Sequence, residues 1–222
     1  LANLIFAFPA PIILALILNE LRCKWFKRTA QTLVYIPHFV SIVIVAALTF
    51  QMFSTTDGAI YHILTQIFGS NAPDLLSDPK LFPALIVGQN IWKETGYGTI
   101  IYLAALSGVD PTLYDAAAVD GAGRFRRVLH VTIPAIMPTI IIMFILRVGQ
   151  FMSVGYDKIL LLYNSSIYET ADVISTFVYR KGVVESNFSF SAAVGLFNSI
   201  VNFFLVVIVN KISDMVSETS LW

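Results

Sequence analysis

Long apolar runs separated by short polar segments make up the pattern along the chain. Crossing about 30 Å of hydrocarbon takes about 20 apolar residues of helix, because each residue rises about 1.5 Å. Five runs come close to that length and predict membrane-spanning helices over residues 1–18, 33–53, 81–106, 134–154 and 188–209. Polar residues interrupt the third run, so its assignment depends on the apolar residues that flank them. The pattern therefore predicts an all-α polytopic membrane protein.

Composition supports this prediction and excludes other classes. The chain has 222 residues, is 57% hydrophobic and only 13% charged, and has a mean hydropathy of +0.76. Soluble domains carry about 25% charged residues. The formal net charge is zero, which argues against a nucleic-acid partner. Cys23 is the single cysteine, so an internal disulfide framework and a Cys-rich metal site are excluded.

The first residue, Leu1, lies inside an apolar run with no basic stretch before it. A secretory signal peptide would show a basic start and a small-residue cleavage site. We therefore expect a membrane domain, residues 1–222, that lacks its N-terminal beginning and upstream helices.

Basic residues indicate the orientation, because short basic segments near membrane helices stay in the cytoplasm. Asn19–Ala30 and Ser107–Ile133 are short and basic, whereas Ser54–Lys80 and Gly155–Asn187 are mainly acidic. The basic segments and the C-terminus should therefore be cytoplasmic. Within the first outer segment, Ala59–Phe68 has apolar residues at helical spacing, which fits either a short interfacial helix or a loop packed on the bundle.

The cytoplasmic segment 107–133 carries the strongest local signals. Asp110 can cap a helix whose first residue is Pro111, and Gly121 can end it in a left-handed conformation. A second helical stretch, Arg124–Val131, should lead into the next span. Three alanines in the middle of the first helix, with Leu113, Tyr114 and Val119 beside them, make a low surface for a docking partner. The same helix would also serve as a plain connector between two spans.

A motif in this segment resembles the EAA loop of ABC-importer permeases. The string is Asp115-Ala116-Ala117, three residues, Gly121, nine residues, then Val131-Thr132-Ile133-Pro134. The EAA pattern is Glu-Ala-Ala, three residues, Gly, nine residues, Ile, one residue, Leu-Pro. Asp115, Val131 and Ile133 depart from it but keep charge or apolar character. The wider chain, including Phe8–Pro11, Trp92–Glu94 and Ser191–Phe197, resembles permeases of oligosaccharide and polysaccharide importers of the alginate-carrying type.

The resemblance implies a multi-helix bundle of the type I ABC-importer permease, in the bacterial cytoplasmic (inner) membrane. It implies a homologous second permease, two cytoplasmic ATPase subunits, an external solute-binding protein and an oligosaccharide as partners. By the same resemblance, the helix would couple to an ATPase, with Arg126 and Arg127 as rim contacts. The coupling residues would be Asp115, Ala116, Ala117, Ala118, Gly121 and Arg124.

No loop of the form G-x-x-x-x-G-K-[ST] is present, so we expect ATP and Mg²⁺ to bind partner subunits and this chain to be no enzyme. The three histidines, His38, His62 and His130, are far apart in the predicted topology and predict no metal site.

Polar residues inside predicted spans are candidates for a transport path, since they are costly in lipid and usually face a cavity or a partner. Amides and flat rings, such as Tyr97, suit a sugar, and cations at Lys93 and Arg147 suit an acidic one. The alternative is that these residues only hold helices together. The path candidates are Gln89, Asn90, Trp92, Lys93, Glu94, Arg147, Gln150, Asn198 and Asn202.

Three functions follow from the sequence. The leading interpretation is a permease subunit of an ATP-driven oligosaccharide importer. A second interpretation is a permease of an ABC importer that carries glycerol-phosphate or an amino acid. It stays open because the coupling segment indicates an ATPase partner and does not indicate the ligand. A third, an ion-driven secondary transporter, would need an intramembrane ion site and related halves, which the sequence does not indicate.

Overall fold

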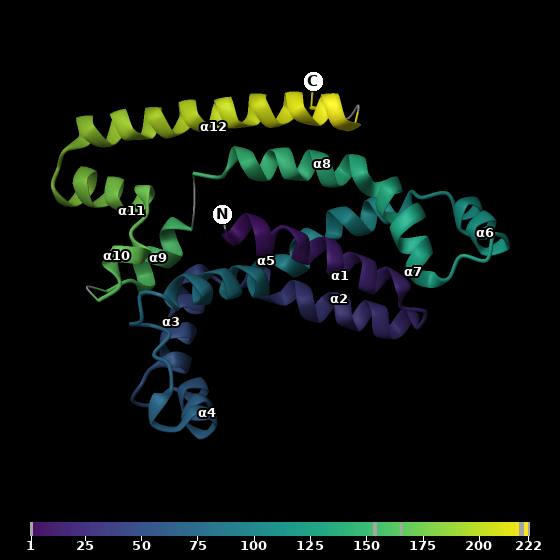
Figure 1. Cartoon of the computed structure of the whole chain (residues 1–222). Helices are drawn as coiled ribbons and strands as arrows, with labels where there is room; N and C mark the ends of the chain where they lie inside the picture. Colours follow the sequence, from purple (N-terminus) through teal and green to yellow (C-terminus); the bar gives the residue numbers. More distant parts are fainter. Residues whose placement is uncertain (1, 153–154, 165, 218–219, 222) are drawn as a thin grey trace. The chain divides into compact units, whose positions relative to one another are not determined.

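The computed structural model describes residues 2–152, 155–164, 166–217 and 220–221 (Figure 1). Within those ranges the chain forms helices and turns and no strand, which confirms the all-α prediction. The helices are η1 (Asn3–Ala7), α1 (Pro9–Glu20), α2 (Lys24–Phe39), α3 (Ile42–Phe53), α4 (Ala59–Phe68), η2 (Gly69–Asn71), α5 (Phe82–Ser107), α6 (Pro111–Val119), α7 (Arg124–Arg127), η3 (Val128–Thr132), α8 (Ile133–Gly149), α9 (Tyr156–Leu162), α10 (Tyr168–Ala171), α11 (Ile174–Tyr179), η4 (Arg180–Val184) and α12 (Phe188–Ser217).

Three of the described helices are long and apolar enough to cross a membrane, namely Asn3–Glu20, Arg124–Gly149 and Phe188–Met215. A fourth is added if the bent pair α2 and α3 forms one broken span. Helix α5 has the length of a span but is not among them, in keeping with the polar residues at its centre. Its crossing of the membrane stays a prediction. Leu1 and residues 153–154, at the ends of two predicted spans, lie outside the described residues.

Helix α2 begins before the predicted second span. The sequence assigned Asn19–Ala30 to a loop and began the second span at residue 33, whereas the helix already begins at Lys24. Its first half is polar, so a search for apolar runs does not detect it. The helix contains Pro37 and ends at Phe39. Proline lacks an N–H and weakens the helix around it, which fits an ending two residues later.

The predicted outer segments contain helices of their own. Helix α4 has the bounds predicted from its apolar spacing, and it packs against α3. Four further helices, α9, α10, α11 and η4, lie within the second outer segment. This segment is not a surface loop throughout, because α9 packs against α3 and buries three of its seven residues.

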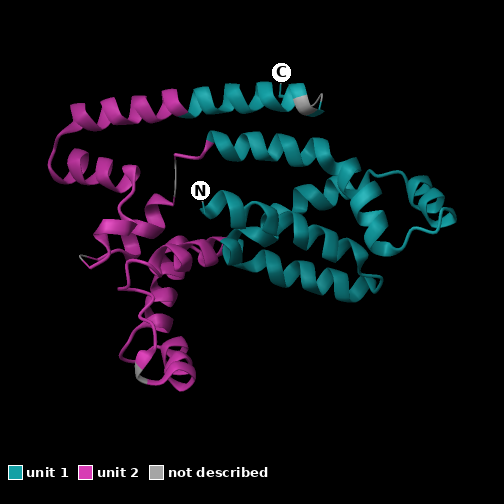
Figure 2. Cartoon of the chain, in the orientation of Figure 1, with its two compact units in different colours: residues 1–38, 91–149, 202–222 teal, residues 39–90, 150–201 magenta. Residues whose placement is uncertain are grey.

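The chain forms two compact units, coloured separately in Figure 2. Unit 1 comprises Leu1–His38, Ile91–Gly149 and Asn202–Trp222. Its core joins α1, α5 and α8 through the buried residues Ala15, Tyr102, Leu106 and Ile136. Helix α5 also approaches α2 closely, since a β-carbon at Gly96 would lie 1.8 Å from the carbonyl oxygen of Val34. Glycine therefore lets the two helix backbones touch.

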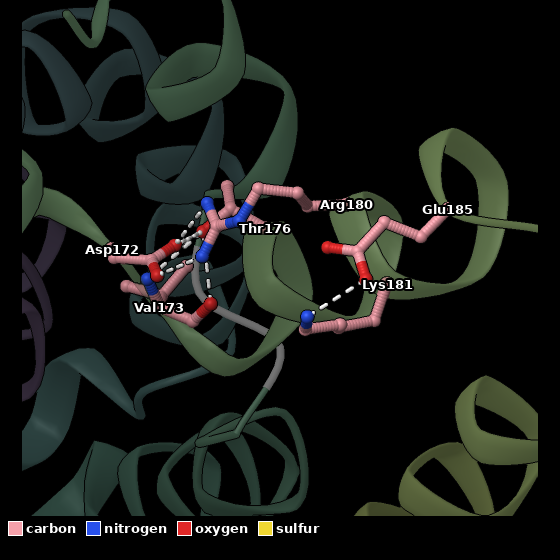
Figure 3. Close-up of polar contacts among 6 residues, drawn as sticks. All are labelled: Asp172, Val173, Thr176, Arg180, Lys181 and Glu185. Carbon is pink, nitrogen blue, oxygen red and sulfur yellow. Dashed lines mark hydrogen bonds and ion pairs between the residues drawn. The ribbon is translucent and has the colours of Figure 1, made fainter. Parts of the chain in front are cut away.

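Unit 2 comprises Phe39–Asn90 and Gln150–Val201. Its core contains Ala46, Phe82, Ile86, Ile159, Leu162, Ile167 and Ala171. A polar network then fixes the start of α11 (Figure 3): Arg180 Nη2 donates to Asp172 Oδ2 at 2.6 Å, and Thr176 Oγ1 donates to Asp172 Oδ1 at 2.6 Å. Burial alone would raise the pKa of Asp172, but the hydrogen bonds from Arg180 and Thr176 hold that pKa below its usual value.

Candidate functional site

Helix α6 begins with a complete N-terminal cap. The Asp110 carboxylate accepts a hydrogen bond from the Thr112 N–H at 2.9 Å, and Pro111 occupies the first helical position. The bond from Thr112 to the charged carboxylate lowers the pKa of Asp110. The predicted start of this helix is confirmed.

The C-terminal end of α6 is a Schellman motif. Gly121 has φ +75°, and its N–H donates to the Ala118 carbonyl at 3.1 Å. The Ala122 N–H donates to the Ala117 carbonyl at 2.9 Å. These two bonds satisfy carbonyls that a helix end would leave unpaired. The predicted stop at Gly121 is therefore confirmed, and both helix ends are fixed by adjacent residues.

The structure brings the predicted coupling residues together on and next to α6. Asp115, Ala116, Ala118, Gly121 and Arg124 are exposed, and Ala117 is half-buried. The other side of α6 is attached to η3, because the Tyr114 hydroxyl lies 3.2 Å from Thr132 Oγ1. The second helical stretch forms as predicted, as α7 and η3, and continues into α8. The result is a short rigid helix, α6, that carries a surface of small residues. It lies next to the N-terminal end of the long apolar helix Arg124–Gly149.

The predicted path residues on α5 have partners far away in sequence. Lys93 is buried, and its ammonium group donates to the carbonyl oxygen of His38 at 2.5 Å and to that of Pro37 at 3.5 Å. Both carbonyls belong to the last turn of α2, where the helix dipole favours a positive charge. Lys93 therefore caps the C-terminal end of another helix.

Glu94 points to the same helix end. Its Oε2 atom lies 2.9 Å from Nδ1 of His38, and its Oε1 atom lies 3.9 Å from the Lys93 ammonium. The His38 ring stacks on Tyr97 with centroids 3.9 Å apart and planes 5° apart. Lys93 is thus held by this chain's own carbonyls and carboxylate. This arrangement favours the structural interpretation of Lys93 and weakens its expected role in binding an acidic sugar.

Gln89 and Asn90, one turn earlier on α5, contact residues of unit 2. Gln89 Nε2 donates to Thr49 Oγ1 on α3 at 2.6 Å, and both residues are buried. The ammonium group of the buried Lys158, on α9, hydrogen-bonds to Asn90 Oδ1. A buried lysine bonded to a predicted path residue makes this amide cluster the best candidate in unit 2 for contact with a polar ligand.

The remaining path candidates are not gathered into these clusters. Trp92, Arg147 and Gln150 are exposed, and Trp92 retains 53% of its accessible surface. Asn198 and Asn202 are half-buried on α12. The Asn198 Oδ1 atom is buried and has no hydrogen-bond partner among the described residues.

Sequence reasoning missed Lys158, His38 and Thr49. Lys158 was assigned to an outer loop, yet four apolar residues, Ile159–Leu162, follow it directly, a signal that could have indicated a buried helix. His38 was considered only as a metal ligand. Two of the contacts that these residues form join distant segments, since Lys158 and Asn90 are 68 positions apart and His38 and Glu94 are 56 apart.

Comparisons with known proteins identify the family of the chain. The family model described as "Binding-protein-dependent transport system inner membrane component" matches residues 7–214. Protein LplB of Bacillus subtilis (strain 168) is 46% identical over 99% of this chain and 69% of its own length. The polygalacturonan/rhamnogalacturonan transport system permease protein YteP of the same organism is 43% identical over 99% of this chain and 68% of its own length.

A solved structure is similar as well. A chain of the bacterial alginate ABC transporter, in complex with an alginate pentasaccharide-bound periplasmic protein, superposes with a TM-score of 0.95. The two chains are 41% identical, and the match covers 99% of this chain and 76% of the other.

Proposed function

The chain belongs to the family of inner-membrane components of binding-protein-dependent transport systems, and we propose that it forms part of the translocation path for an acidic oligosaccharide. It is a multi-pass membrane permease and a transport subunit rather than an enzyme. We further propose that it pairs with a second, homologous permease. Two cytoplasmic ATPase subunits, which bind ATP and Mg²⁺, drive it, and an external binding protein delivers the sugar.

The observation that carries this proposal is the capped helix α6. Its ends are satisfied by Asp110, Gly121 and Ala122, and its alanine surface is open. A short helix whose ends are fixed moves as one body. After the turn that follows α6, the chain continues through α7 and η3 into the apolar helix α8. Closure of the ATPases would push α6 and tilt α8 with it, which is the rigid-body type of transition.

Acidic cargo is supported by two lines of argument. Polygalacturonan and alginate, named for two similar proteins, are polymers of uronic acids and carry a carboxylate on each unit. The chain holds a buried cation at Lys158 beside the amide of Asn90, and an exposed cation at Arg147. A lysine buried on a helix packed into unit 2 is costly unless a polar or anionic group compensates its charge. A passing carboxylate would compensate this charge through a charge-assisted hydrogen bond, which is stronger than a bond to a neutral amide.

The transport test uses the assembled transporter in proteoliposomes. We expect uptake of uronate oligosaccharides, delivered by the binding protein, to require hydrolysable ATP and to continue when ion gradients are dissipated. Uptake that follows an ion gradient without ATP would instead indicate a secondary transporter. Uptake of glycerol-phosphate or an amino acid, with none of oligosaccharides, would keep the class and change the cargo.

Two variants test the acidic cargo. Lys158→Gln and Arg147→Gln should each lower uptake of a uronate oligosaccharide more than uptake of a neutral one of equal length. Lost charge-assisted hydrogen bonds predict roughly a tenfold difference for a residue that grips the carboxylate. Equal uptake of acidic sugar by wild type and variant would remove that residue from the path. A complex that fails to assemble would instead assign Arg147 to pairing with the second permease.

Orientation is tested with the single native cysteine. Cys23 is exposed, and the basic residues around it predict a cytoplasmic position, as they do for α6 and the C-terminus. A membrane-impermeant thiol reagent should label Cys23 only after the membrane is opened. Asp74→Cys, in a chain whose Cys23 is replaced by Ser, should be labelled in intact cells. The reverse pattern would move α6 to the side without ATPases and overturn the proposal.

A further inference from the structure

A surface hollow lies between α6 and the helical stretch formed by α7 and η3. Its volume is about 420 Å³. Small side chains at the end of α6 and in the turn after it form one wall, and nitrogen-bearing side chains of α7 and η3 form the other. The lining residues are Ala117, Ala122, Arg126, Arg127, His130 and Val131.

The electrostatics of the hollow favour an anion. Both guanidinium groups keep their charge at any physiological pH. Neither Arg126 nor Arg127 forms an ion pair within the part of the chain that the structure describes. His130 Nδ1 donates to the Arg126 carbonyl at 3.0 Å, so the guanidinium groups rather than the imidazole are the donors available to an anion. The lining includes no carboxylate that would repel an anion.

The hollow also differs in position from the exposed surface of α6. Ala116 and Ala118 are exposed, whereas Ala117, which lines the hollow, is half-buried beside η3. The long apolar helix Arg124–Gly149 starts at this wall, so the hollow lies at the end of a predicted span. Lipid headgroups occupy that level of the membrane, and basic pockets on the cytoplasmic side favour anionic ones.

We propose that this hollow is an anion site that binds a phosphate group, either from an anionic lipid headgroup of the cytoplasmic leaflet or from inorganic phosphate. Two guanidinium groups suit the oxygens of a phosphate, because Arg binds them through paired N–H donors. A phosphate held by the two arginines fills the space between the end of α6 and the stretch formed by α7 and η3, and so restricts the joint through which α6 moves α8. The regulatory effect rests on the proposed function, whereas the binding itself does not.

The test uses the complete transporter in nanodiscs of phosphatidylcholine, with and without phosphatidylglycerol. Lipid retained by the complex is counted by native mass spectrometry, and its unfolding temperature is measured with and without millimolar inorganic phosphate. The variants are Arg126→Gln with Arg127→Gln, and Ala122→Glu, which places a carboxylate in the hollow. The matched control is Arg22→Gln with Arg28→Gln, two exposed basic residues on the same predicted side that do not line it.

We expect wild type and the control to bind the anion, and both hollow variants to bind it about tenfold more weakly. Retention of phosphatidylglycerol alone identifies the source as a lipid headgroup, and stabilisation by inorganic phosphate in neutral discs identifies it as free phosphate. Equal anion binding by wild type, control and hollow variants would overturn the proposal. If the double arginine variant loses its ATPases while Ala122→Glu binds anions normally, the arginines are ATPase contacts and the anion site is refuted. Because binding is measured without transport, a wrong assignment of the cargo leaves this result unaffected.

Discussion

The helix ends of α6 and α2 are stabilised in opposite ways. At α6, each terminal hydrogen bond closes within a few residues, from Thr112 to Asp110 at 2.9 Å and from Ala122 to Ala117 at 2.9 Å. At the C-terminal end of α2, the carbonyl of His38 accepts its hydrogen bond from Lys93, 55 residues away, at 2.5 Å. The first helix end depends on its own segment, and the second depends on α5.

The difference has a mechanical consequence. A helix whose caps are local keeps its form when its surroundings move, so α6 can transmit a displacement as a rigid body. The end of α2 keeps its cap only while α5 stays in place, and Gly96 makes that contact possible by bringing the two backbones together. Breaking the long-range contact should therefore reduce stability, whereas breaking the local cap should reduce coupling.

The largest effect is expected from Gly96→Ala. Its β-carbon would lie 1.8 Å from the Val34 carbonyl oxygen, which is backbone and can move away only if the helices separate. We expect a loss of about 3 kcal/mol in unfolding free energy, at the upper end for overpacking. Thermal unfolding in detergent measures it. The control is Gly88→Ala on the same helix, where nothing lies within 4 Å. A small gain in stability is expected there, and equal effects at both glycines would contradict the close contact.

Lys93→Met should come next. It keeps the length of the side chain but removes the donor to the His38 and Pro37 carbonyls and leaves Glu94 without a neighbouring cation. Unpaired buried acceptors predict a loss of about 2 kcal/mol in unfolding free energy. If Lys93 instead served the cargo alone, Lys93→Met would unfold like wild type and lose only uptake of acidic sugars.

The contacts of Gly96 and Lys93 with α2 are examples of what could not be predicted from the sequence. The bounds of α6, its caps and the bounds of α4 follow from residues within one or two helical turns; those of α6 were predicted, and α4 is one of the two alternatives that its spacing left open. The burial of Lys158 and the pairing of Lys93 with the end of α2 join segments 55 to 68 residues apart. Periodicity and hydropathy describe one segment at a time, so they identified Lys93 as polar and costly but not its partners, and they left Lys158 in an outer segment. The polar first half of α2 was missed for the same reason.

Gly121→Val tests the local side of the comparison. A β-branched residue at φ +75° costs about 1 to 2 kcal/mol, although nothing lies within 4 Å of the position. We expect sugar uptake and binding-protein-stimulated ATPase activity to fall together by about tenfold, with a fall of about 2 to 8 °C in unfolding temperature. Gly123→Val is the matched control, since that glycine is equally open but has φ −66°. Normal sugar uptake by Gly121→Val would show that the turn at Gly121 is not needed for coupling to the ATPases.

The smallest effect on stability is expected at the Asp172–Arg180 pair (Figure 3). Its partners are eight residues apart, a separation between that of the local caps of α6 and that of the contact between α2 and α5. Arg180 lies over the rings of Tyr168 and Phe177, at 5.7 and 5.6 Å from their centroids, so its guanidinium is held in place. The hydrogen bond from Arg180 helps to keep the pKa of Asp172 below its usual value, and the bond to Asp172 raises the pKa of Arg180.

A depressed carboxyl pKa in the folded state adds stability above the unfolded value of about 3.9, and this stability is lost as the pH falls through the folded pKa. Asp172→Asn should therefore be less stable than wild type at neutral pH, by about 1 kcal/mol or less because both side chains are partly exposed. The difference should shrink only in acid below about pH 4, where wild type also loses its charge. Glu185→Gln is the control, because it breaks the more exposed Lys181–Glu185 pair of the same region and should change stability less. Unfolding temperatures measured across the acid range would refute this assignment if the Asp172→Asn difference were the same at every pH.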